Sequence, residues 1–216
     1  MIERWLLQIK NMGVLFWFPI LGYAVILPLC VFILNSSVQD ESDRYYNLCM
    51  MYYRLVPFFS VLWMWMVHKE YMQGEGKEIL ILGRGISSST VFFWGLNVIC
   101  LFSLYGIGRM MDLEVNSLIS EMILVTFFIN GLAFMLDFTI KETALSMLLI
   151  VLYVMISNVD INNFFGLFTE SVIGDSIRKC CYTILITSGM ESSEAYTFLA
   201  TGGIFWLIGI FKAKRL

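Results

Sequence analysis

Residues 14–34 form an apolar run without a single charged side chain. About 20 consecutive apolar residues are enough for a helix to cross the hydrocarbon core of a bilayer. Further runs of similar character follow at 49–67, 90–108, 118–136, 143–159 and 195–211. Only 14% of the residues are charged, against about 25% in soluble domains. The sequence therefore predicts an all-α integral membrane protein, with residues 1–216 as a single transmembrane domain of six transmembrane helices, and excludes an ordinary soluble enzyme.

Residues 1–12 have the pattern of an amphipathic helix. Apolar side chains recur at the i, i+3, i+4, i+7 spacing of one helical face: Ile2, Trp5, Leu6 and Ile9. Such a helix lies in the headgroup layer of a membrane, with its tryptophan as an interfacial anchor. A cytoplasmic extension of the first transmembrane helix is the alternative that these residues allow.

The distribution of Lys and Arg among the loops predicts the orientation. With six spans, both termini share one side with the loops 68–89 and 137–142. That side holds nine basic residues: Arg4, Lys10, Lys69, Lys77, Arg84, Lys141, Lys212, Lys214 and Arg215. The other side holds four: Arg44, Arg109, Arg178 and Lys179. Because basic residues concentrate in cytoplasmic loops, we expect a multi-pass plasma-membrane protein with both termini in the cytoplasm.

Residues 160–194, on the predicted outer side, alternate short apolar patches with charged residues. No patch exceeds about 11 residues, which is too short to cross a bilayer. We expect two outer re-entrant helices before the last span, and a seventh span is the alternative.

Several polar or small residues inside the predicted spans have two interpretations. Arg54 and Glu121, near the outer ends of their spans, could form an intramembrane pair or reach the headgroups separately. Asn97 and Asn130 lie near mid-depth, where such side chains join helices more often than they line a transport pathway. Gly202 and Gly209 share one face of the last span, which favours close helix packing.

The motifs of several enzyme classes are absent. Gly76-Lys77 lacks both the upstream glycine and the following hydroxyl of a nucleotide-binding loop. His68 is the sole histidine, so a two-histidine metal site cannot form within one chain. A membrane enzyme would need a cluster such as Glu121, Asp137 and His68, but the two carboxylates are 16 residues, about 24 Å, apart along one helix. We expect no enzymatic activity, no cofactor and no metal in this chain.

The coupling segment, defined here as 68–89, carries most of the charge between the second and third spans. It begins as a short charged helix interrupted by glycines, and continues with aliphatic residues and a serine-rich return to the membrane. Such a cytoplasmic hairpin can press on a soluble partner and pass force into the spans on either side of it. A solvated hairpin without a partner is the alternative.

This segment resembles that of the type-2 membrane subunits of ATP-binding cassette (ABC) exporters. The matching residues are Lys69-Glu70, Gly74 or Gly76, Glu78-Ile79-Leu80 and Ile86-Ser87-Ser88. The amphipathic start, the six spans, the outer re-entrant segment and the basic tail extend the resemblance over nearly the whole chain. In place of the proline usual after the aliphatic residues, this chain has Gly83-Arg84-Gly85.

The resemblance implies a permease subunit of an exporter. Its partners would be a second permease chain, identical or different, and separate ABC ATPase subunits that hold ATP and magnesium. Residues 68–82 would be the coupling helix, with an ATPase-coupling surface formed by Lys69, Glu70, Tyr71, Met72, Gly74, Glu75, Gly76, Glu78, Ile79 and Leu80. Exposed salt bridges from its glutamates contribute only about 0–1 kcal/mol each, so its apolar residues would provide most of the docking energy.

The transported substrate would be amphipathic or apolar: a peptide, a drug or a lipid-linked molecule. The alternative function is that of an ATP-independent immunity or sensor protein that binds a peptide in the membrane. The largest basic cluster is the tail at Lys212, Lys214 and Arg215, so we expect membrane lipid but no nucleic acid among the partners.

Overall fold

The computed structural model describes residues 2–36, 38, 40–73, 86–158 and 192–214. Within these ranges the chain is helical and contains no strand, which confirms the all-α fold. The helices are α1 (Ile2–Met12), η1 (Gly13–Phe16), α2 (Trp17–Leu21), η2 (Gly22–Ile26), α3 (Leu27–Asn35), α4 (Glu41–Gln73), α6 (Ile86–Leu101), α7 (Ser103–Met110), α8 (Asn116–Ile140), α9 (Thr143–Asn158) and α12 (Ser192–Ala213).

Five helices among the described residues are long and apolar enough to cross a membrane. They are Trp5–Asn35 (continuing through a bend), Glu41–Met72, Ile86–Met110, Asn116–Ile140 and Tyr196–Ala213. Each contains one of the predicted spans almost completely, so the chain is a multi-pass membrane protein by length and composition. The remaining predicted span, 143–159, corresponds to α9, whose apolar part Thr143–Met155 is shorter. The predicted re-entrant segment, up to residue 191, lies outside the described residues.

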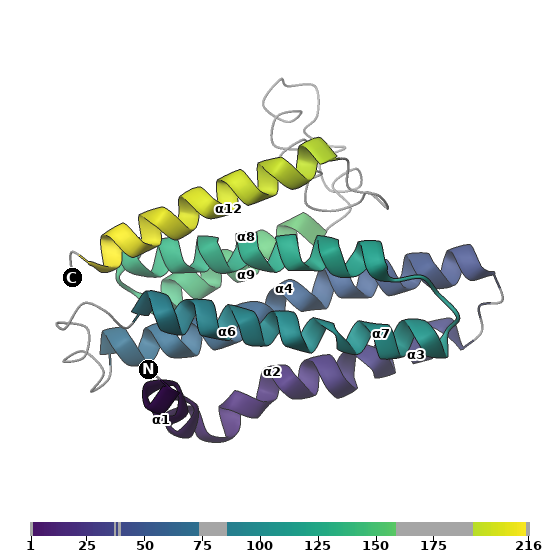
Figure 1. Cartoon of the computed structure of the whole chain (residues 1–216), viewed down its shortest axis with the longest axis horizontal. Coiled ribbons are helices and arrows are strands. Elements are labelled where there is room, and N and C mark those ends of the chain that lie inside the picture. Colours follow the sequence, from purple (N-terminus) through teal and green to yellow (C-terminus); the bar gives the residue numbers. More distant parts are fainter. Residues whose placement is uncertain (1, 37, 39, 74–85, 159–191, 215–216) are drawn as a thin grey trace.

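The helices form a bundle in which α8 contacts α4, α6, α9 and α12 (Figure 1). At one end of this bundle, on the left of Figure 1, lie α1, the C-terminal ends of α4, α8 and α12, and the N-terminal end of α6. We call it the α1 end. The far end is the opposite one, where α4 and α8 begin. Helix α1 and the C-terminal end of α12 thus lie at the same end of the bundle.

The first span bends sharply where it meets α1. Gly13 has a φ of +56°, a conformation that glycine adopts readily and other residues rarely. As a result α1 is seen nearly end-on in Figure 1, whereas α2 and α3 run along the bundle. Helix α1 therefore lies across the end of the bundle, while the helical path continues from Trp5 to Asn35.

The irregular path of the first span follows from its prolines. Pro28 has no N–H, and its ring clashes with the carbonyl four residues earlier. The π-helical turn η2 lies directly before it, which is one of the ways a helix absorbs such a defect. Gly22 in this turn allows close packing, since a Cβ there would lie 2.6 Å from the Phe59 ring of α4.

Helices α8 and α12 pack closely through glycines on both sides. A Cβ on Gly131 would lie 2.6 Å from the Trp206 ring, and one on Gly209 would lie 2.7 Å from Phe134. Gly202 is similarly close to Phe127, at 2.9 Å. The expectation that Gly202 and Gly209 serve helix packing is confirmed.

Candidate functional site

Helix α1 is fastened to the ends of α4 and α6 by hydrogen bonds and one ring stack. The Gln8 side chain donates to the hydroxyl of Tyr71 at 2.6 Å, and this hydroxyl lies 3.1 Å from the Ser89 hydroxyl. Nearby, Asn11 donates to the Glu70 carboxylate at 2.6 Å. The Trp5 ring stacks on Phe92 with centroids 4.4 Å apart. Residues of α1 therefore hold both helices that flank 74–85.

A second group of polar side chains lies in the interior at the same end. Nδ1 of His68 in α4 is 2.5 Å from the Asp137 carboxylate in α8, and Nε2 is 3.2 Å from the Thr90 hydroxyl in α6. His68 is fully buried and Asp137 is 2% exposed. The imidazole also packs against the rings of Phe134 and Phe138, each with its centroid 5.2 Å away. One imidazole thus links three helices.

The contacts of this group satisfy its buried polar atoms. The Thr90 hydroxyl is 2.9 Å from the Ile86 carbonyl and 3.2 Å from Nε2 of His68. Nδ1 of His68 and the Asp137 carboxylate share a hydrogen bond. Buried polar groups without such partners would be strongly destabilising.

We call these residues the polar joint: Gln8, His68, Tyr71, Ser89, Thr90 and Asp137. Its members come from the last turns of α4 and α8, the first turns of α6, and α1. The chain between α4 and α6, residues 74–85, lies outside the described residues. The joint therefore ties both helices that border 74–85 to each other, to α8 and to α1.

The predicted ATPase-coupling residues that the structure describes belong to α4 rather than to a separate short helix. Lys69 is exposed, with its Nζ 5.1 Å from the centroid of the Trp65 ring. Glu70 and Met72 are half-buried, and Tyr71 is only 2% exposed. Tyr71 is therefore placed inside the polar joint rather than on a docking surface, because its hydroxyl has partners on α1 and α6. The predicted residues Gly74, Glu75, Gly76, Glu78, Ile79 and Leu80 lie outside the described residues.

The two predicted groups of intramembrane polar residues have definite environments. Glu121 is 8% exposed and accepts a short hydrogen bond from Tyr53. The side chain of Arg54 is exposed. Glu121 therefore pairs with the Tyr53 hydroxyl rather than with the Arg54 guanidinium.

Asn97 and Asn130 are both fully buried. Asn97 accepts from the Tyr23 hydroxyl at 3.3 Å and donates to the Ser60 carbonyl at 3.2 Å, contacts that join three helices. Asn130 donates to the Thr126 carbonyl of its own helix at 2.7 Å. Asn97 therefore joins helices, as expected, whereas the hydrogen bond of Asn130 lies within α8.

Thr90, His68 and Asp137 have the residue types of a hydroxyl–imidazole–carboxylate triad, and all three are buried inside the bundle. Their contacts join α4, α6 and α8, and the Thr90 hydroxyl also lies 2.9 Å from the Ile86 carbonyl. Among the described residues, no three His, Cys, Asp or Glu side chains gather as a metal site would require.

The sequence contained an indication of the contact between His68 and Asp137. His68 and Asp137 each end a predicted span on the predicted cytoplasmic side. The structure brings these two together, and Glu121 lies near the beginning of α8, at the far end. The separation of Glu121 from Asp137 was correctly anticipated, but the pairing of Asp137 with His68 was not.

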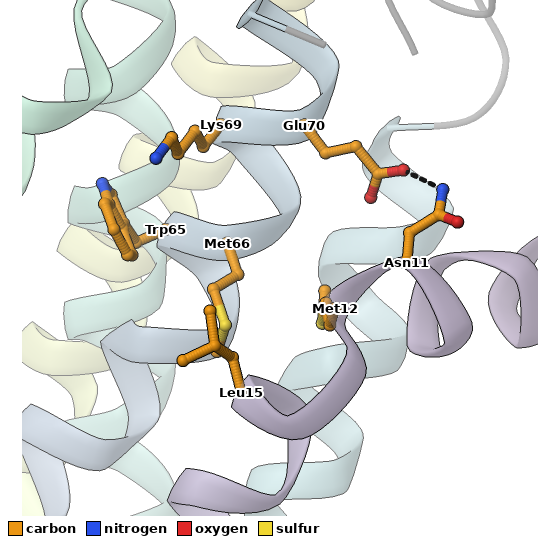
Figure 2. A pocket seen from close by; sticks show the side chains of 7 residues that line it. All are labelled: Asn11, Met12, Leu15, Trp65, Met66, Lys69 and Glu70. Atoms are coloured by element: carbon orange, nitrogen blue, oxygen red, sulfur yellow. Dashed lines mark hydrogen bonds between the residues drawn. The ribbon is translucent and has the colours of Figure 1, made fainter. Parts of the chain in front are cut away.

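A cavity of about 440 Å³ opens between α1 with η1 and the last turns of α4. Its lining residues are Asn11, Met12, Leu15, Trp65, Met66, Lys69 and Glu70. Figure 2 shows Lys69 and Trp65 on one side of α4, and Glu70 on the side nearer α1, where it meets Asn11. Comparison of the chain with family models, with curated proteins and with solved structures finds no match.

Proposed function

We propose that this chain is the permease subunit of an ABC-type exporter that moves an amphipathic or apolar substrate across the plasma membrane. Energy would come from ATP hydrolysis in separate ATPase subunits that bind the coupling segment from the cytoplasm. Two permease chains, identical or different, would form the transport unit. In this arrangement α9 is the fifth of six spans, α12 is the sixth, and both termini are cytoplasmic.

The single observation that carries the proposal is the polar joint. Force applied to 74–85 must enter the bundle through the end of α4 and the beginning of α6. His68, Thr90 and Asp137 connect these two helix ends to α8, and Tyr71 connects them to α1. A segment that transmits force needs such a rigid connection to the helices that it moves, whereas a passive loop does not.

The mechanism follows from how a ligand shifts a conformational equilibrium. ATP bound to the ATPase subunits favours whichever permease conformation contacts them better. The docked coupling segment would carry that preference to α4 and α6, and the joint would carry it on to α8. Because α8 packs closely on α12 through Gly131, Gly202 and Gly209, a displacement of α8 would move α12 with it.

The proposal predicts that the double substitution Glu78→Ala/Ile79→Ala uncouples the transporter. Purification from native membranes should recover an ATPase subunit with the wild-type chain. In the reconstituted complex, the double substitution should remove substrate-stimulated ATP hydrolysis while the chain still inserts in the membrane. Glu142→Ala, an exposed carboxylate between α8 and α9 at the same end, is the matched control and should couple normally.

Failure to recover any nucleotide-hydrolysing partner would favour the ATP-independent immunity or sensor protein. Labelling of 74–85 from outside the cell would contradict the orientation. Unchanged coupling in the double variant would contradict the role of this segment.

A further inference from the structure

The cavity between α1 and α4 lies where the headgroup layer meets the hydrocarbon core. Helix α1 lies across the end of the bundle, and its Leu6 and Leu7 are each 59% exposed although Trp5 packs against the protein. Exposed leucines on an interfacial helix are covered by lipid. The wall of the cavity is apolar at Met12, Leu15 and Met66, and its charged side chains, Lys69 and Glu70, lie at the end of α4.

Two hydrogen-bond donors line this cavity, an exposed ammonium group and a buried indole nitrogen. The indole nitrogen of Trp65 is buried and has no hydrogen-bond partner. The ammonium group of Lys69 lies over the Trp65 ring, and its nitrogen and the indole nitrogen lie on the same side of α4 in Figure 2. An indole N–H and an ammonium are both donors only, so together they call for an anionic oxygen acceptor such as a phosphate.

The opposite side of the cavity carries one negative charge. Glu70 accepts a single hydrogen bond there, from Asn11 at 2.6 Å, and a carboxylate can accept several. Lys69 and Glu70 together give the cavity no net charge. A zwitterion therefore complements it better than an anion does.

We propose that this cavity binds a phospholipid whose headgroup combines a phosphate with a primary ammonium, as in phosphatidylethanolamine. Lys69 and Trp65 donate to the phosphate, Glu70 accepts from the ammonium, and an acyl chain lies along Leu15 and Met66. A volume of about 440 Å³ is within the usual range for a small-molecule site. The site requires only that the chain lies in a membrane, so it stands or falls independently of the exporter proposal.

The test is native mass spectrometry of the full chain after reconstitution in vesicles that contain equal amounts of phosphatidylethanolamine, phosphatidylglycerol and phosphatidylcholine. We expect the wild type to retain phosphatidylethanolamine preferentially. Lys69→Gln should lower that retention by about tenfold, the effect of one charge-assisted hydrogen bond. Lys10→Gln, an exposed lysine of α1 outside the cavity, is the matched control and should change nothing.

Two further variants separate the parts of the proposed recognition. Trp65→Phe keeps an aromatic wall and removes the indole donor, so retention should fall by about threefold. Glu70→Gln keeps an acceptor for Asn11 and removes the charge, so the preference should change from phosphatidylethanolamine to phosphatidylglycerol. If Lys69→Gln does not give a monodisperse protein, Lys69→Met replaces it.

Equal retention of the three lipids by the wild type would overturn the proposal. So would equal losses in the Lys69→Gln and Lys10→Gln variants, or a Glu70→Gln variant that keeps the original preference.

Discussion

The two ends of the bundle are held together by different kinds of contact. At the α1 end, His68, Asp137, Thr90 and Tyr71 are buried and connect four elements through direct polar contacts. At the far end the contacts are mixed: Glu121 accepts a short, part-buried hydrogen bond from Tyr53, and Tyr45 and Ser117 meet through an exposed hydrogen bond of 3.3 Å. A contact from Arg44 to the Met111 carbonyl is longer still, at 3.5 Å.

This contrast indicates how firmly each end is held. Exposed polar contacts exchange readily with water and contribute little net free energy, whereas breaking a buried contact leaves polar groups without partners. The exposed contact between Tyr45 and Ser117 can therefore rearrange at small cost, whereas separating the helices at the α1 end would leave several buried polar groups without partners. An end that receives force should be rigid.

The largest expected effect comes from removing one partner of the buried pair. Asp137→Ala leaves the His68 imidazole buried with an unsatisfied nitrogen, so the free energy of unfolding should fall by about 3–5 kcal/mol. Glu114→Ala removes an exposed carboxylate at the far end and should cost less than about 0.5 kcal/mol. Unfolding in mixed micelles by titration with a denaturing detergent measures both. Similar losses for the two variants would remove the distinction between the ends.

A smaller effect should separate two tyrosine-to-phenylalanine variants. Tyr71→Phe deprives Gln8 and Ser89 of a buried partner, which should cost about 1–3 kcal/mol. Tyr45→Phe removes only the exposed contact with Ser117 and should lie within about 0.5 kcal/mol of the wild type. The same unfolding measurement compares them. A larger loss for Tyr45→Phe than for Tyr71→Phe would reverse the ranking of the two ends.

Much of the fold could be predicted because membrane helices leave a strong local signal. Runs of apolar residues predicted the five long helices, and most of the predicted helix ends agree with the structure to within a few residues. Helix α4 is an exception, because it extends beyond its predicted span in both directions. The spacing of Trp5 and Ile9 gave α1. Gly202 and Gly209 predicted close packing because the absence of a side chain lets another helix approach closely, whichever helix that is.

The pairings between helices could not be predicted from single runs. Which residues of α4 and α8 meet depends on how each helix is rotated about its axis, and nearly uniform apolar sequences such as these record that rotation weakly. Hence the Tyr53 partner of Glu121 was not predicted, and Tyr71 was assigned to a surface although it is buried. The predicted span 143–159 agrees with α9, Thr143–Asn158, over the residues that the structure describes.

The central claim is that His68 and Asp137 hold α4 to α8, and a double-mutant cycle tests it most directly. The variants are His68→Leu, Asp137→Leu and the double substitution, each measured by unfolding in mixed micelles. Because replacing both members of a buried pair removes the unsatisfied groups together, the double variant should be at least about 2 kcal/mol more stable than the sum of the single losses implies. Losses that add within about 0.5 kcal/mol would show that the two residues act independently, and would contradict the account.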